Sequence, residues 1–196
     1  MKVDVERISR YIGLTEEDVR RLSGECAQIL LPRTEEIVGG VLSSMVGDEE
    51  VVDIVTRAGL SPERAKGLLR EWLKMVLLGE YGEEHARRAF KIGLAHCRAG
   101  VPETVVTLTV GAFAREATRV LSEEGRADLI GGLQKALFWN LAIMLESYST
   151  ARKRSFERST GIPDGLVERL IALSAGEIYE EMSSELWGIR GSRREP

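Results

Sequence analysis

The most strongly patterned segment of this sequence lies between Arg126 and Tyr148 and reads RADLIGGLQKALFWNLAIMLESY. Apolar side chains recur in it at intervals of three and four residues, at Ile130, Leu133, Leu137, Leu141, Met144 and Tyr148. This spacing places them along one face of an α-helix, because a helix completes a turn in about 3.6 residues. A helix with such a face must be covered by other apolar surfaces, so the fold has to supply further packed elements.

Other segments carry the same periodicity together with recognisable helix ends. Thr15, with Asp18 three residues later, is typical of a capped helix start. Ser61 followed by Pro62 predicts another start, because proline suits the first helical position. Gly100 predicts the end of the helix that begins near residue 83.

Residues 104–110, TVVTLTV, have the β-branched composition of a strand. The apolar residues that follow nevertheless keep a helical spacing, at Val106, Val110, Phe113, Ala117, Val120 and Leu121. We therefore predict a helix here as well. Six or more helices without strands indicate an all-α fold.

Two adjacent glycines, Gly39 and Gly40, interrupt the helix predicted after Pro32. Each costs about 1 kcal/mol relative to alanine inside a helix. Either they allow another backbone or a ligand to approach closely, or they are simply tolerated.

The length of 196 residues suits one domain with an extension. The sequence after Tyr148 becomes polar and basic and is then broken by Gly161 and Pro163. This change favours a compact domain over residues 1–150 and a linker with a C-terminal helix over residues 151–196. That last helix has an apolar side, which we expect to be buried against the domain or a partner chain.

Charge and hydropathy exclude several kinds of partner. The net charge of −4 provides no basic field for a nucleic acid. No apolar run approaches the ~18 residues of a membrane span, and the N-terminal residues are charged where a secretory signal needs an apolar core. Cys26 and Cys97 form neither a CxxC pair nor a zinc pattern, which favours free buried thiols in a reducing cytoplasm.

His96 is one of only two histidines. On a helix it shares a face with Ala89, Ile92 and Gly93, and the two small residues suggest open space for a planar group beside the imidazole. His85 lies about three helical turns away, roughly 16 Å, so the two histidines cannot hold one metal ion.

Sequence motifs for catalysis are missing. The sequence contains no GxSxG, no HExxH and no phosphate-binding loop, and its many carboxylates suit a solvated surface. The residues alone leave three roles open for His96: a packed core or surface histidine, a ligand, or a catalytic base.

Three stretches resemble the globin domain of globin-coupled sensors and, more distantly, the protoglobins: YIGLTEEDVRRL, LLGEYGEEHARRAFKIGLAHCRAGVP and ALFWNLAIMLESY. The family pattern, G-x-Y followed by I-G-x-x-H and a glycine and proline stop, is matched by Gly79, Tyr81, Ile92, Gly93, His96, Gly100 and Pro102. The resemblance covers about residues 8–150. It implies a globin fold with an added N-terminal helix.

The resemblance also implies a cofactor, haem b, with His96 as the proximal ligand of the iron and O2, CO or NO as the gas bound. The second nitrogen of a ligating imidazole needs a partner, and carbonyls one turn back, near Ile92, are candidates. Eight residues are then expected to contact the haem: Leu42, Leu68, Leu69, Trp72, Ile92, Val101, Val106 and Leu137.

The distal side departs from the family pattern. Sensor globins commonly carry a Phe-Tyr pair on the second helix, and the tyrosine hydroxyl bonds the oxygen. Here VLSSMV places Val41 and Leu42 at those positions. A pocket without this donor is expected to favour CO and NO over O2, with the indole N–H of Trp72 as an alternative donor.

We therefore expect an all-α globin-fold haem protein that binds or senses a diatomic gas and is not an enzyme. Two alternatives stay open: a haem-free globin-like domain for signalling or dimerisation, and a haem enzyme acting on peroxide or nitric oxide.

The expected partners are a second copy of the chain and a signalling protein. The family's dimer interface uses the first helix and the last globin helix, where Leu141, Leu145 and Tyr148 either serve this purpose or belong to the intramolecular core. The chain is expected to be either a single-domain sensor globin or a piece of a longer sensor.

Overall fold

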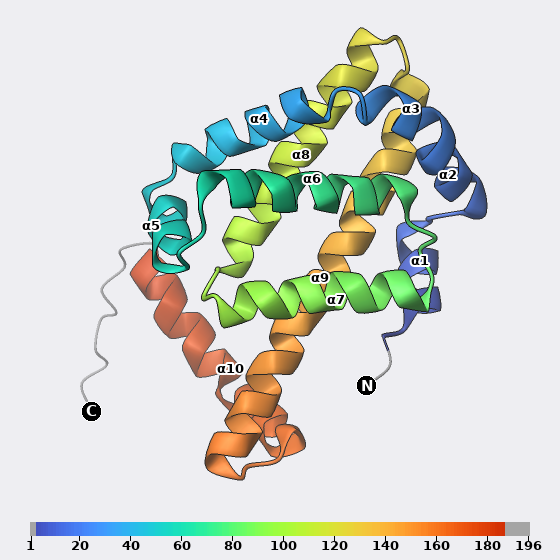
Figure 1. The fold of residues 1–196 in the computed structure, drawn as a ribbon. Coiled ribbons are helices and arrows are strands. Elements are labelled where there is room, and N and C mark those ends of the chain that lie inside the picture. The colour runs from blue at the N-terminus through green and yellow to red at the C-terminus, as the bar shows by residue number, and fades with distance from the viewer. Residues whose placement is uncertain (1–2, 187–196) are drawn as a thin grey trace, which may run out of the picture. The chain divides into compact units, whose positions relative to one another are not determined.

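The computed structural model describes residues 3–186, and their regular structure is entirely helical (Figure 1). The helices are α1 (Val5–Ile12), α2 (Glu16–Arg21), α3 (Ala27–Leu30), α4 (Thr34–Val46), α5 (Glu49–Arg57), α6 (Pro62–Leu78), α7 (Glu83–Arg98), α8 (Glu103–Glu123), α9 (Ile130–Thr160) and α10 (Asp164–Leu186). A π-helical turn, Leu22–Cys26, joins α2 to α3, and a 3-10 turn, Ala127–Leu129, precedes α9. The all-α prediction is confirmed.

The predicted helix ends are present. The Thr15 hydroxyl accepts from the backbone N–H of Asp18 at 3.1 Å, and the Asp18 carboxylate accepts from the backbone N–H of Thr15 at 2.9 Å. Ser61 caps α6, whose first residue is Pro62. The β-branched stretch over residues 104–110 lies inside α8, as its longer-range spacing predicts.

Contacts divide the chain between Ser149 and Thr150 into two compact units. This boundary falls inside α9, which runs without interruption past Tyr148 and ends before Gly161, where φ is +71°. The polar, basic composition after Tyr148 does not stop the helix, because arginine and lysine are good helix formers.

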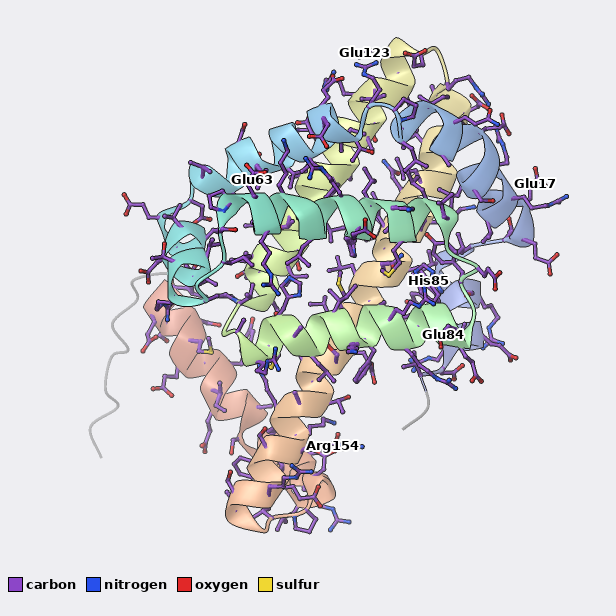
Figure 2. All side chains as sticks on the ribbon, viewed as in Figure 1. Glu17, Glu63, Glu84, His85, Glu123 and Arg154 are labelled. Atoms are coloured by element: carbon purple, nitrogen blue, oxygen red, sulfur yellow. The ribbon has the colours of Figure 1, made fainter. Side chains whose placement is uncertain are left out.

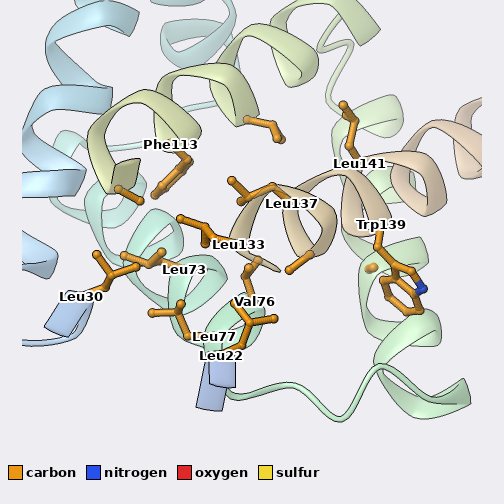
Figure 3. Packing of buried hydrophobic residues seen from close by; sticks show 14 of the residues in the cluster. Leu22, Leu30, Leu73, Val76, Leu77, Phe113, Leu133, Leu137, Trp139 and Leu141 are labelled. Carbon is orange, nitrogen blue, oxygen red and sulfur yellow. The ribbon is translucent and has the colours of Figure 1, made fainter. Parts of the chain in front are cut away.

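The core of the first unit forms where α6, α8 and α9 meet (Figure 3). Its fully buried side chains include Leu73 and Leu77 of α6, Phe113 of α8, and Leu133 and Leu137 of α9. In Figure 3, Trp139 points to the opposite side of α9. There its indole N–H donates to the Ser9 hydroxyl at 2.9 Å, which ties α1 to α9.

The structure gives a reason for one of the two adjacent glycines in α4, Gly40. A Cβ added there would lie 2.5 Å from Cδ of Glu116, whose side chain enters from α8. Gly39, by contrast, has nothing within 4 Å of an added Cβ. Gly40 therefore serves the packing of α4 on α8, which an ion pair of 2.6 Å between Glu36 and Arg119 also supports.

Two residues considered for a dimer interface belong to the core instead. Leu141 and Tyr148 are only 7% and 2% exposed, respectively. The Tyr148 hydroxyl donates to the carbonyl of Val101 at 2.8 Å. Leu141 and Tyr148 therefore belong to the intramolecular core. Of the three residues considered for the dimer interface, only Leu145 is partly exposed.

No helix within residues 3–186 is long and apolar enough to cross a lipid bilayer.

Candidate ligand site around His96

His96 lies in the last turn of α7, and the chain fixes this helix end closely. The backbone N–H of Val101 donates to the carbonyl of His96 at 3.0 Å, and that of Gly100 donates to the carbonyl of Cys97 at 3.1 Å. This pair of bonds, with Gly100 at φ +72°, is a Schellman helix end. The Tyr148 hydroxyl holds Val101 from α9, so the turn that follows His96 is anchored to the core.

The imidazole of His96 is fixed in one tautomer. Its Nδ1 lies 2.9 Å from the carbonyl oxygen of Ile92. A carbonyl oxygen can only accept, so Nδ1 carries the proton and donates. The neutral ring therefore presents an unprotonated Nε2, the form that ligates a metal. The expected partner near Ile92 is confirmed.

The surrounding donors fit a metal that brings most of its own ligands. Among residues 3–186, no group of three or more His, Cys, Asp or Glu side chains is placed to hold an ion. A metal at His96 would thus take fewer than three such ligands from the described part of the chain. A haem iron meets this condition, because the macrocycle supplies four nitrogens and the protein an axial imidazole.

The small residues beside His96 serve a different purpose from the one their sequence suggests. A Cβ added at Gly93 would lie 2.1 Å from the Ser147 hydroxyl and 2.5 Å from the Met144 carbonyl oxygen, both on α9. Ala89 is fully buried. The interpretation that these residues open a flat space is wrong: Gly93 lets α7 and α9 approach closely.

The residues expected to contact haem fall into three groups. Val106 and Leu137 are buried in the core. Five are partly buried and pack against that core from α4, α6, α7 and the turn after α7: Leu42, Leu69, Trp72, Ile92 and Val101. Leu68 is 57% exposed and is not among the residues that pack on the core. Figure 1 shows α6 and α7, which carry most of the second group, running across α8 and α9.

Trp72 holds an unsatisfied donor. Its Nε1 is buried and has no hydrogen-bond partner, and no other buried side-chain nitrogen or oxygen of the described residues shares this condition. The ring packs against Phe113 with centroids 4.8 Å apart. An unpaired buried donor costs about 1–3 kcal/mol.

His85 belongs to a separate polar cluster that the sequence did not reveal. Figure 2 places it at the N-terminal end of α7. It is 6% exposed, and its Nε2–H donates to Oδ1 of Asn140 at 2.9 Å. Asn140 in turn donates to the carbonyl of Ala136, which fixes the orientation of its amide. The scarcity of amides in the sequence was the one available signal that Asn140 has a special role.

Gly79 and Tyr81, which form the G-x-Y element, both lie against the ring of His85. Tyr81 stacks on the His85 ring at 4.5 Å and is the one described non-glycine residue with positive φ, at +56°. A Cβ at Gly79 would lie 1.9 Å from Nδ1 of His85, so only glycine fits there. Burial lowers the pKa of His85, while the bond to Asn140 opposes this shift.

The two cysteines differ in accessibility. Cys26 is 1% exposed, and burial raises the pKa of its thiol to about 11. Cys97, directly after His96, is partly exposed. Both are free thiols, as predicted, but the prediction that both are buried is wrong for Cys97.

One cavity of about 160 Å³ lies between the N-terminal segment and α7. It is lined by Val3, Val5, Glu83, Ala86, Arg87, Phe90, Lys91 and Leu94. None of these is among the residues expected to contact haem, so this cavity is distinct from the site around His96.

The chain is similar to known proteins both in sequence family and in structure. A protein-family model described as protoglobin matches residues 2–154. Among solved structures, the chain is similar to the globin domain of a globin-coupled sensor from Geobacter sulfurreducens, with a TM-score of 0.66 and 21% sequence identity. That match covers 73% of this chain and 96% of that domain, and it confirms the predicted globin fold. No curated protein matches the chain.

Proposed function

The chain belongs to the protoglobin family, and from this membership we propose that it binds haem b through His96 and thereby binds or senses a diatomic gas. The observation that carries the proposal is the Nδ1 bond from His96 to the Ile92 carbonyl. It leaves Nε2 free on a helix end that Tyr148 anchors to the core.

The proposed contacts divide by side. Leu42, Leu69 and Trp72 would face the gas, and Ile92 and Val101 would lie on the side of His96. Val106 and Leu137 would close the interior end. When bound, ferrous haem supplies the open coordination position at which O2, CO or NO binds. Leu68 is the weakest of the proposed contacts, because it is mostly exposed.

We assign no enzymatic activity to the site. The proposed pocket contains apolar side chains, one indole N–H and the ligating imidazole. Peroxide or nitric oxide chemistry generally requires a distal group that transfers protons, and none of the proposed contacts can do so. The role we favour is therefore reversible gas binding by a cytoplasmic homodimer that reports to a signalling partner.

The experiment is an absorption spectrum of the purified protein and of His96→Ala, each supplied with haem. Wild type should show a Soret band with a five-coordinate ferrous spectrum. His96→Ala should lose that spectrum and regain it when imidazole is added. Arg98→Ala, which changes an exposed side chain of the same helical turn, should match wild type.

Two outcomes would contradict the proposal. A wild-type protein that takes up no haem would favour the haem-free globin-like alternative. Identical spectra for wild type and His96→Ala would place the ligand elsewhere. His85→Ala is a poor control because His85 is buried and bonded to Asn140, so its loss should disturb the fold.

A further inference from the structure

Trp72 differs from Trp139, the other tryptophan of the first unit. The Nε1–H of Trp139 donates to Ser9 across two helices. The Nε1–H of Trp72 is equally inaccessible but meets no acceptor within residues 3–186. The fold thus satisfies one buried indole and leaves the other unpaired.

The surroundings of Trp72 indicate that its acceptor comes from outside the chain. Its ring lies against Phe113, and the next residue, Leu73, is fully buried in the core. Leu69, one turn earlier, packs on the same core. These neighbours are apolar and offer no side-chain acceptor.

Three external acceptors deserve comparison. A buried water needs about two to four polar partners, and the side chains of Leu69, Leu73 and Phe113 provide none. A haem carboxylate needs solvent or a cation, whereas Nε1 of Trp72 has no accessible surface. A diatomic ligand is small and largely apolar, and one hydrogen bond satisfies its outer atom.

We propose that the indole N–H of Trp72 is the hydrogen-bond donor to the gas ligand on the distal side. This inference rests on the proposed haem function. It takes up the alternative that the sequence left open for Trp72, in place of the donor that is missing with Leu42 at the usual tyrosine position. Trp72 on α6 takes the role that a tyrosine on the second helix has in related sensors.

A donor at Trp72 makes the chain discriminate between O2 and CO. Dioxygen becomes partly negative when it binds ferrous iron, so a donor stabilises it. Carbon monoxide acquires little charge and gains less from the same bond. Trp72 therefore determines how long O2 stays bound relative to CO.

The test compares wild type, Trp72→Phe and Trp139→Phe. Phenylalanine keeps the aromatic packing on Phe113 and removes the N–H. In the haem-loaded protein, Trp72→Phe should release O2 ~10- to 100-fold faster and CO at nearly the wild-type rate. It should also raise the stretching frequency of bound CO, a spectroscopic reading that a merely structural role would not change.

Haem-free protein gives an independent reading. Trp72→Phe loses ring volume but also removes a donor that has no partner there, so it should lose less stability to denaturant than Trp139→Phe does. Trp139→Phe breaks the bond to Ser9 and should unfold more easily, with O2 release unchanged. Adding Leu42→Tyr to Trp72→Phe should restore slow O2 release by supplying a hydroxyl donor.

The outcomes separate the two proposals. A Soret band with O2 release and CO frequency unchanged by Trp72→Phe would overturn the role of Trp72 alone. A haem-free Trp72→Phe that loses at least as much stability as Trp139→Phe would also overturn it, because its N–H would then have a partner. No Soret band in wild type would overturn the haem function and this inference with it.

Discussion

Among single residues, His85 couples protonation to folding most directly. Its ring is buried between Tyr81, Trp139 and Asn140, and this burial lowers its pKa below that of an exposed histidine. The neutral form is the one that fits, because Nε2–H donates to Asn140 and Nδ1 faces Gly79. A charged ring there would lack both water and a counter-ion.

Stability should therefore fall on mild acidification. The unfolded chain takes up a proton at His85 near pH 6.5, before the folded chain does. The free energy of unfolding should then decrease as pH falls below about 6.5, by at most about 1.4 kcal/mol per pH unit, and level off below the folded pKa. Denaturant titrations of the haem-free protein between pH 7.5 and 5 measure this slope.

His85→Gln provides the control for this slope. Glutamine can still donate to Asn140 but does not titrate, so the slope above pH 5 should flatten. At neutral pH the variant should be less stable by about 1–2 kcal/mol, because it loses the stacking on Tyr81. An unchanged slope would show that the acid sensitivity does not arise from His85.

The sequence singled out His96 as a proposed ligand, partly for a wrong reason. Its orientation by the Ile92 carbonyl follows from helix geometry and could be predicted. The role of Gly93 could not, because the sequence cannot show that Met144 and Ser147 of a distant helix lie against it. The same limit hid the His85–Asn140 pair, whose members are 55 residues apart.

Among the helices, α9 leaves an apolar strip on its outer surface. Phe138 is 60% exposed, and Ala142 and Leu145, one and two turns later, are partly exposed. This strip, rather than the buried Leu141 and Tyr148, is available to the proposed homodimer. Covering an exposed phenylalanine contributes about 1.5–3 kcal/mol.

Phe138→Glu should weaken the dimer, with a dissociation constant raised ~10- to 100-fold. The change should leave the monomer folded, because the side chain is mostly in solvent. Sedimentation equilibrium across a range of concentrations measures it. Leu108→Glu makes the same replacement at an equally exposed site on α8 and should leave the dimer intact. Equal weakening by both variants would argue against a role for α9.

Helix starts and stops were the most predictable part of the fold. Thr15, Ser61 and Gly100 act through bonds to residues a few positions away, so the local sequence contains the full pattern. The length of α9 was less predictable. Its polar residues after Tyr148 signal a change of surroundings, and only Gly161 ends the helix.

At the level of the whole molecule, α10 stands out for the apolar side chains that it exposes. None of its side chains is buried, and its exposed apolar residues are Leu166, Leu170, Ile171, Leu173, Ile178, Tyr179, Met182 and Leu186. Within the second unit, Lys153 of α9 pairs with Glu168 at 2.8 Å and with Asp164 at 3.2 Å. These exposed pairs contribute little stability.

Backbone amides of α10 should exchange more slowly as protein concentration rises. A helix with this much apolar surface is expected to associate with a second copy, and association protects its amides. Hydrogen exchange at two concentrations, compared for α10 and for α7 as the internal reference, measures the effect. Strong protection that does not depend on concentration would contradict self-association. A complete lack of protection would contradict burial of the apolar side of α10 by any protein surface.

The fold class and family were accessible from sequence because helical spacing and the I-G-x-x-H element are local patterns of this chain, although the solved sensor domain with a similar fold is only 21% identical to it. The distal pocket was not. Whether Trp72 has a partner depends on the packing of α6 against α8, and no local pattern contains that information.

The contrast between the two thiols has a practical consequence. Cys26 is buried in the core and the pKa of its thiol is raised, so maleimide reagents, which react with thiolates, should not modify it. Cys97 is reachable and lies next to His96. The unmodified chain can therefore carry a single fluorescent label beside the proposed ligand, positioned to be quenched when a haem enters.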